Sequence, residues 1–380
     1  MKGTIRVGAA VLLGLGTCCS MAWAQAPTEA IRQVVTNNTA YGTTAAEFLQ
    51  IPATARGSAL GPAYAALASD LGSMYFNPAG LALLERPGVL ASSMTYIADT
   101  RYAYGAFGAP FGGGSRAVGF SVTTFGFSDQ PVYTVEDPQG ASGQVYSVRQ
   151  TAVSGTYSQQ FSDRFSAGLS LKIVTDQLGE VSGQAFAVDF GTNFHSTLAG
   201  RTIRAAFTIT NLGSNLRHSG TPLDVLYLRQ PPAGQVQVPQ EPAKATLQTK
   251  DWNLPVTFRV ALAYDAFSTT SSRLTLLGEF DQPNNSEPGF NLAGEYNLTL
   301  GRSGFSLAGR AGMTYASDDN LSPTAEAAGF ESAFGSEQYR ISAGGGLRYS
   351  RGTFGIGFDY AYRSSGLLGG VKMLGVSVSW

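Results

Sequence analysis

Hydrophobic and polar residues alternate along most of the chain beyond residue 88. At the C-terminal end, every second residue from Leu374 to Trp380 is large and hydrophobic, and the residues between them are glycine or serine. Successive side chains of a β-strand point to opposite faces, so this pattern predicts a strand with one hydrophobic and one small or polar face. Residues 256–265 and 354–363 repeat the pattern.

About 14 segments with this alternation follow one another, each close to the roughly ten residues that a tilted membrane-spanning strand needs. The segments are expected to begin near Val89, Tyr102, Ala117, Val148, Phe165, Gln184, Thr202, Pro255, Arg273, Phe290, Phe305, Tyr339, Thr353 and Lys372. The chain is therefore predicted to be all-β and to form a transmembrane antiparallel up-and-down β-barrel of about 14 strands.

The lengths of the connections between these segments alternate as well. Every long connection (126–146, 212–253 and 317–338) falls in one alternate set, whereas the other set consists of short turns such as 161–164 and 350–352. A membrane barrel whose termini lie in the periplasm has short turns on that side and longer loops outside. A large secreted β-sandwich, the soluble alternative, does not require this alternation.

Composition agrees with a membrane barrel. Only 13% of the 380 residues are charged, 43% are hydrophobic and 47 are glycine, whereas soluble domains carry roughly a quarter charged residues. After the N-terminal segment there is no run of about 20 hydrophobic residues, so no spanning helix is expected in the mature chain. The 25 basic residues nearly balance the 26 acidic ones, and nothing suggests nucleic-acid binding.

Residues 1–24 have the features of a signal peptide. Lys2 and Arg6 supply the positive start, residues 7–16 form the hydrophobic stretch, and Ala22-Trp23-Ala24 gives a small-residue cleavage site. We therefore expect the protein to be exported and to reside in the bacterial outer membrane.

Both cysteines, Cys18 and Cys19, lie in this signal segment, where the sequence before Cys18 only distantly resembles a lipoprotein site. The mature chain would then contain no cysteine. This excludes disulfides, thiolate metal sites and cysteine nucleophiles. No cofactor and no metal ion are expected.

Residues 25–47 are small and polar, and we expect a periplasmic N-terminal tail. Residues 48–87 differ, because their alanine-rich runs favour short helices, which Asn77-Pro78 interrupts. A barrel of about 14 strands encloses more space than its own side chains fill. We therefore expect residues 48–87 to lie as a plug inside the barrel, residues 88–380. The alternative is a helical cap on a soluble domain.

Charged residues occupy polar positions of several predicted strands, where they would face the lumen. These residues are Lys172, Asp189, Arg204, Arg259, Glu279, Glu295, Arg310, Arg348 and Asp359. They could line a hydrophilic or regulated passage. We favour the alternative, a paired network that braces the plug, since buried charges need partners.

The sequence gives little basis for catalysis. The candidate general bases are His195 and His218, which belong to opposite ends of the predicted barrel and so cannot act together. Trp380 ends an alternating strand, and it resembles the C-terminal signal that the barrel assembly machinery reads. We expect a non-enzymatic protein whose partners include that machinery and outer-membrane lipids.

The plug region also carries a specific series of residues: Phe48-Leu49, Ile51-Pro52, Ala55-Arg56, Leu60-Gly61, Ala63, Ala65-Ala66, Asp70, Ser73 and Asn77-Pro78-Ala79-Gly80-Leu81-Ala82. This series resembles the N-terminal signature of the PorV/PorQ family, a branch of the FadL-like outer-membrane β-barrel proteins. The resemblance implies a small plug whose motif residues are Arg56, Gly61, Asp70, Asn77, Pro78, Ala79 and Gly80.

The resemblance implies one of two roles. PorV-type proteins serve type IX secretion, receiving exported cargo from a translocon and passing it on for surface attachment. FadL-like channels instead take up hydrophobic molecules such as long-chain fatty acids. We expect the docking role in protein secretion, with transport of a hydrophobic ligand as the alternative.

The longest connection, residues 212–253, bears on this choice. It contains five prolines and a hydrophobic run, residues 223–228. The run could cover the pore, receive a partner, or pack onto the barrel rim. A lid would favour a ligand channel, whereas a docking surface would favour cargo transfer.

Overall fold

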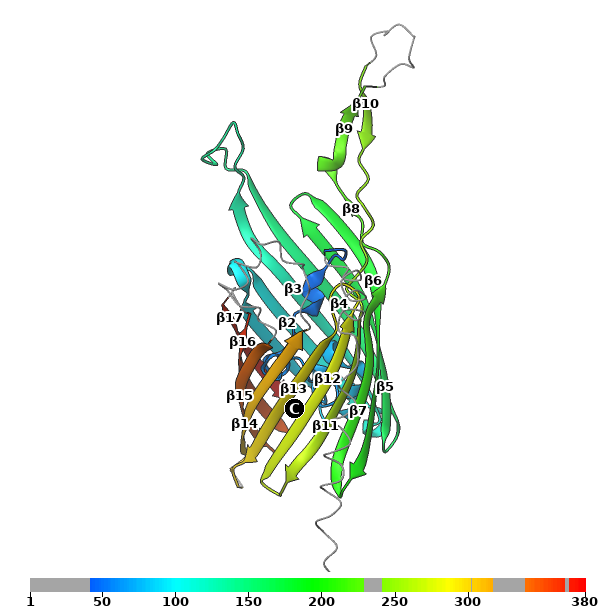
Figure 1. Ribbon diagram of the computed structural model, residues 1–380, viewed down its shortest axis with the longest axis vertical. Helices are drawn as coiled ribbons and strands as arrows, with labels where there is room; N and C mark the ends of the chain where they lie inside the picture. The colour runs from blue at the N-terminus through cyan, green and yellow to red at the C-terminus, as the bar shows by residue number, and fades with distance from the viewer. Residues whose placement is uncertain (1–41, 229–240, 302, 317–338, 366–368) are drawn as a thin grey trace, which may run out of the picture.

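A computed structural model describes residues 42–228, 241–301, 303–316, 339–365 and 369–380. Fourteen long strands form one closed antiparallel β-barrel, as predicted (Figure 1). Neighbouring strands pair in chain order, and the first strand pairs with the last, Gly88 opposite Ser379 and Thr95 opposite Lys372.

The barrel strands run from β1 to β7 and from β11 to β17. Their bounds are β1 Gly88–Thr95, β2 Arg101–Phe111, β3 Arg116–Pro131, β4 Val145–Ser162, β5 Phe165–Leu178, β6 Val181–Leu198, β7 Arg201–Gly213, β11 Thr257–Ser268, β12 Ser272–Pro283, β13 Gly289–Thr299, β14 Phe305–Ala316, β15 Tyr339–Arg351, β16 Phe354–Ser364 and β17 Gly370–Ser379. Every predicted strand is present and begins within three residues of its expected start.

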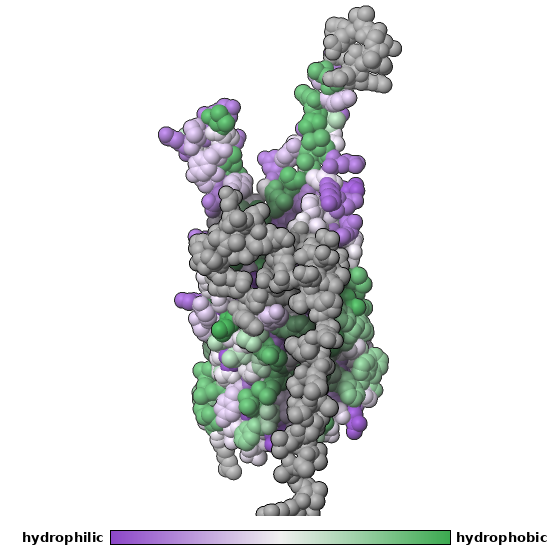
Figure 2. Space-filling model, viewed as in Figure 1, coloured by the Kyte–Doolittle hydropathy of each residue, from purple (hydrophilic) through white to green (hydrophobic). Residues whose placement is uncertain are grey.

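The outer face of the barrel is hydrophobic. Large side chains that alternate with inward-facing residues are exposed there, as with Leu171 at 62% and Leu374 at 63%. Hydrophobic residues cover much of the side of the barrel in its lower half (Figure 2). Such a belt is typical of a barrel surrounded by lipid.

None of the helices in the described ranges has the length and hydrophobicity needed to cross a membrane.

The two ends of the barrel differ. The short-turn end carries both the start of β1 and the C-terminal residue, where the Trp380 N–H donates to the carbonyl of Pro87 at 3.1 Å. The long-loop end carries the connections β3–β4 and β7–β11, and β14 ends there. A hairpin of β9 (Asp224–Tyr227) and β10 (Ala243–Thr246) projects from that end (Figure 1). Its base is tied to β6 through β8, His218–Ser219.

Four short helices lie inside the barrel and form the plug: η1 Glu47–Gln50, α3 Ala55–Ala59, α4 Ser73–Phe76 and η2 Pro78–Leu83. Thr54 caps α3, its side chain accepting the N–H of Gly57, and Asn77 caps η2. The alanine-rich residues 63–67 form turns rather than a helix. Single-turn helices also occur in connections, at η3 Ile97–Asp99, η4 Gly112–Gly114 and η5 Thr221–Leu223.

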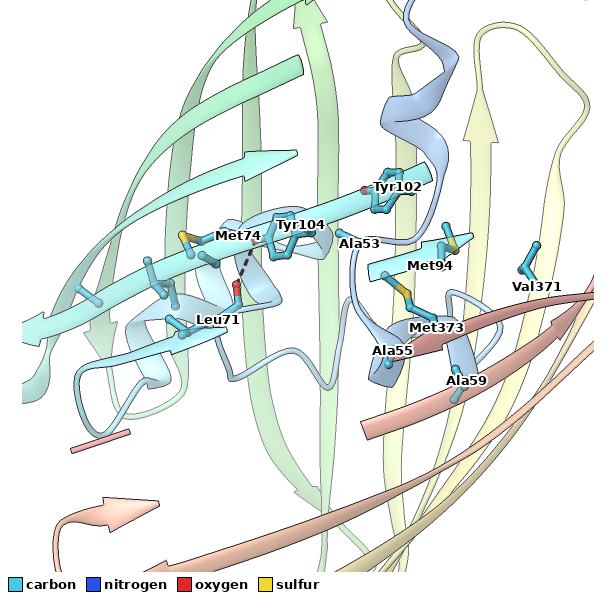
Figure 3. Close-up of a cluster of buried hydrophobic side chains, with 14 residues drawn as sticks. Ala53, Ala55, Ala59, Leu71, Met74, Met94, Tyr102, Tyr104, Val371 and Met373 are labelled. Atoms are coloured by element: carbon cyan, nitrogen blue, oxygen red, sulfur yellow. Dashed lines mark hydrogen bonds between the residues drawn. The ribbon is translucent and has the colours of Figure 1, made fainter. Parts of the chain in front are cut away.

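The hydrophobic core lies where the plug meets the wall. Figure 3 shows one such cluster, in which Ala55 and Ala59 of α3 lie beside Met373 of β17. In the same cluster the hydroxyl of Tyr104 donates to the carbonyl of Leu71 at 3.3 Å. The plug is thus part of the packed interior of the barrel.

The N-terminal approach to the plug differs from the expected periplasmic tail. Thr44 pairs with Asn253 and the Ala45 N–H donates to the Asn253 carbonyl, so residues 42–47 lie at the long-loop end. The amide of Asn285 holds this segment by donating to Thr44 and Glu47, both at 2.9 Å. A small, polar sequence does not reveal which end of the barrel supplies such partners. Residues 25–41 and the predicted signal peptide lie outside the described residues.

Candidate functional site

Asn77 is fully buried at the corner between α4 and η2. Its Oδ1 accepts the backbone N–H of Ala79 at 3.1 Å. Its Nδ2 donates to the carbonyl of Ala65 in the plug at 3.0 Å and to that of Thr192 in β6 at 3.1 Å. One amide therefore satisfies a helix start, a plug turn and a barrel strand together. This is the geometry expected of a residue that fixes the position of the plug.

The barrel wall has glycine residues where it contacts the Asn77–Pro78 corner. A Cβ on Gly191 of β6 would lie 2.2 Å from Asn77 Oδ1, and a Cβ on Gly168 of β5 would lie 2.4 Å from the carbonyl carbon of Pro78. Both distances are shorter than real Cβ contacts. The corner consequently contacts the wall backbone closely, which larger residues would prevent.

Hydroxyl groups complete the seat of the corner. Ser158 of β4 and Ser166 of β5 both donate to the carbonyl of Ala79, at 3.0 and 3.1 Å. Gly80 is required by a contact within the plug itself. A Cβ at this position would lie 2.1 Å from the carbonyl oxygen of Ala68. We name the contact of Asn77–Gly80 with β4–β6 the corner seat.

A second contact holds the end of α3 against β14 and β15. Gly61 has a φ of +60° and lies against Gly312, where a Cβ would come within 2.5 Å of the carbonyl carbon of Leu60. The Ser342 hydroxyl donates to the carbonyl of Ala59 at 3.0 Å. The positive φ explains the glycine at position 61.

Arg56 connects the plug to the wall by charge. Its guanidinium donates to both carboxylate oxygens of Glu295 in β13, each at 2.8 Å. It also donates to Asp70 at 2.9 Å and to the Tyr64 hydroxyl at 3.0 Å, while the Tyr64 hydroxyl donates to Asp70 at 2.7 Å. Paired, charge-assisted hydrogen bonds of this kind are strong and directional.

The wall extends this chain of charges. Arg310 of β14 donates to Glu295 and to Asp359 of β16, both at 2.6 Å, and its side chain is only 2% exposed. Arg348 of β15 lies farther away, 3.8 Å from Asp70. We name Arg56, Tyr64, Asp70, Glu295, Arg310 and Asp359 the Arg56 network. Burial alone would raise the pKa of Asp70, but the Arg56 guanidinium holds it below its ordinary value.

The remaining predicted lumen charges form separate pairs. Lys172 of β5 lies 2.9 Å from Asp189 of β6 and donates to Asn211 at 2.6 Å. Arg259 of β11 lies 3.6 Å from Glu279 of β12. Arg204 and Asp265 form a further bridge at 3.0 Å.

Two cavities lie on either side of the plug. The upper cavity, about 740 Å³, lies towards the long-loop end and reaches Ile51 and Pro52. The lower cavity, about 390 Å³, extends from Thr54 and Arg56 to Ser379 near the short-turn end. Residues 51–56 therefore stand between the cavities. Inward-facing glycines leave the lower cavity open, as at Gly355 and Gly357.

The two arginines of the upper cavity that sequence reasoning missed are Arg340 and Arg363. Arg363 occupies an inward position of the alternating segment 354–363, so its orientation was available from the pattern. Arg340 lies an even number of positions before Arg348 in the segment that begins at Tyr339, so its orientation was also available from the pattern.

The two histidines lie at opposite ends of the barrel. His195 lies near the end of β6 at the short-turn end, and His218 at the long-loop end contacts Asp176 at 3.2 Å. Within the described ranges, His, Cys, Asp and Glu side chains form no group suited to a metal ion.

Comparison with sequence models of protein families and with curated proteins gives no match. Solved structures do match. The CymD monoaromatic hydrocarbon channel has a TM-score of 0.50 at 12% identity, covering 90% of this chain and 98% of that one. A Pseudomonas aeruginosa FadL homologue (0.48, 10% identity, 86% and 98% covered) and the Ralstonia pickettii toluene transporter TbuX (0.45, 12%, 81% and 92%) are also similar. The likeness to CymD shows a shared barrel fold.

Proposed function

We propose that this protein is a non-enzymatic outer-membrane channel for hydrophobic molecules. The observation that carries the proposal is a closed barrel with a hydrophobic outer face, whose lumen is divided by a plug into two cavities. The fold shared with CymD, a monoaromatic hydrocarbon channel, supports the same class of substrate.

The plug would act as the gate of this channel. A molecule entering from the long-loop end reaches the upper cavity, whose floor includes Phe48, Ile51 and Phe76. Residues 51–56 then block the direct way to the lower cavity. Because Arg56 and Asp70 of the network line the lower cavity, movement there would connect the two spaces.

Binding of an apolar fluorescent probe, N-phenylnaphthylamine, tests the proposal. The protein is placed in lipid nanodiscs, and empty nanodiscs of the same lipid provide the control. We expect a saturable component of probe fluorescence that a monoaromatic hydrocarbon displaces. Fluorescence that rises only in proportion to lipid would contradict the proposal.

A docking role in protein secretion, of the PorV/PorQ type, is the second candidate. One observation favours it. One face of the β9–β10 hairpin is entirely hydrophobic, because Val225 and Tyr227 pair with Ala245 and Ala243. Tyr227 is 55% exposed, and the hairpin stands clear of the barrel (Figures 1 and 2). An isolated hairpin with such a face gains stability from a partner.

Native mass spectrometry of the protein, gently extracted from its own membrane, separates the two candidates. A co-purifying translocon or exported protein that is lost on Tyr227→Ser and Val225→Ser substitution would support docking. A barrel that carries only a small hydrophobic molecule would support the channel.

A further inference from the structure

Two wall arginines, Arg340 and Arg363, line the upper cavity. Ser342 of β15 lies directly opposite Arg363 of β16, and Arg340 precedes Ser342 by two positions, on the same face. The two arginines are therefore diagonal neighbours on the inner wall. The salt bridges among the described residues include neither of them.

Four carboxylates also line the cavity, and none of them forms a salt bridge with this pair within the described residues. The titratable neighbours of Arg363 are Arg340 and the phenols of Tyr75 and Tyr96. The carboxylates that line the cavity have contacts of their own. Asp176 accepts from Gln150 and contacts His218, Asp281 accepts from Asn291, Glu47 accepts from Thr44 and Asn285, and Glu287 also has a partner.

Aromatic rings line the same cavity. Tyr96 packs edge-on against Phe125 with ring centroids 6.1 Å apart, and Phe48 of the plug stacks on Phe125 with ring centroids 6.4 Å apart. Tyr75 and Phe76 add a further edge-on pair at 4.7 Å. Flat aromatic surfaces and two guanidiniums that form no salt bridge with any described residue therefore border one space.

We propose that the upper cavity binds an aromatic carboxylate. The ring would lie among the aromatic side chains, and the carboxylate would accept hydrogen bonds from Arg340 and Arg363, whose planar guanidiniums suit that group. Arg363 is half-buried and Arg340 is exposed. An anion bound between these two like charges lowers their mutual repulsion, which an uncharged hydrocarbon cannot do. A volume of about 740 Å³ is ample for one aromatic ring with a short acidic side chain.

This inference rests on the proposed channel function, and it adds a preference for acids over neutral hydrophobic molecules. The experiment compares 4-phenylbutyrate with its uncharged methyl ester by calorimetry, using protein in nanodiscs at neutral pH. The variants are the double substitution Arg340→Gln with Arg363→Gln, and the charge-preserving double substitution to lysine. Arg348→Gln is the matched control, because Arg348 lines the lower cavity.

We expect the glutamine pair to weaken binding of the acid about tenfold or more and to leave binding of the ester within about twofold. The lysine pair should retain most of the acid affinity, which separates loss of charge from misfolding. Arg348→Gln should change neither ligand. Equal loss for acid and ester, or no loss for the acid, would overturn the inference. Binding of the ester without the acid would overturn the inference but remain consistent with the proposed channel function. Binding of neither ligand would contradict both the inference and the channel function.

Discussion

The plug is attached to opposite parts of the wall by different chemistry. At the corner seat, Asn77 and Ala79 meet β4–β6 through uncharged hydrogen bonds and glycine-backed contacts. In the Arg56 network, the plug is attached to β13 by the ion pair of Arg56 with Glu295. Arg310 connects this pair to β16 through its own ion pair with Asp359. Close backbone contact fixes a position, whereas a network of charges depends on every member being paired.

The two attachments also differ in what they border. Arg56, Asp70 and Asp359 line the lower cavity, and the neighbouring Ile51 and Pro52 line the upper one. The corner residues Asn77 and Pro78 line neither cavity. We infer that the corner seat holds the plug in the barrel, while the side near Arg56 is where a passage would open.

The largest effect is expected from crowding the corner seat. Gly191→Val would place its Cβ 2.2 Å from Asn77 Oδ1. The corner could then no longer contact β6, and the plug should leave the lumen. Single-channel recording in planar bilayers should show a large, steady conductance. The matched control is Gly155→Val on β4, because a Cβ there meets nothing within 4 Å. A closed Gly191→Val barrel would show that the corner does not hold the plug.

Removing the carboxylate at the centre of the Arg56 network should have the next largest effect. Glu295→Gln leaves Arg56 and Arg310 buried without their shared partner, at a cost of about 3–5 kcal/mol. The loss of stability is measured as the change in the denaturant midpoint of unfolding. The folded fraction is monitored by the electrophoretic mobility of the folded barrel. Asp251→Asn removes an exposed partner of Arg217 and should change stability by less than about 1 kcal/mol. Equal midpoints for both variants would refute the importance of the network.

A smaller effect is expected from Asn77→Ala. The variant removes the amide that donates to the carbonyls of Ala65 and Thr192 and accepts the N–H of Ala79, which costs about 1–3 kcal/mol, but it keeps the glycine-backed shape of the seat. The plug should then stay in place and open only briefly, visible as short conductance steps. Conductance as steady as that of Gly191→Val would mean that the amide, rather than the shape, holds the corner.

The sequence allowed the barrel to be predicted almost completely, for a physical reason. A strand between lipid and lumen must alternate, so the period of two appears wherever the wall exists, and all 14 starts were located. The Asn77-Pro78 corner was equally visible, because proline restricts the backbone before it.

The pairing of charges was not predictable in the same way. Glu295 faces Arg310 because β13 and β14 have a particular register, and Arg56 reaches Glu295 only because α3 lies against that wall. Register and plug position depend on contacts between distant segments. The placement of residues 42–47 at the long-loop end was missed for the same reason, since Asn253 and Asn285 are far away in sequence.

The most direct test of the gate is to tie the Arg56 side of the plug to the wall. A Cβ on Gly375 of β17 would lie 3.5 Å from that of Ala55, a separation that suits a disulfide. The double variant Ala55→Cys with Gly375→Cys is compared in oxidised and reduced forms. Uptake of N-phenylnaphthylamine by proteoliposomes should fall on oxidation and recover on reduction. Equal uptake in both forms would contradict a gate formed by residues 51–56.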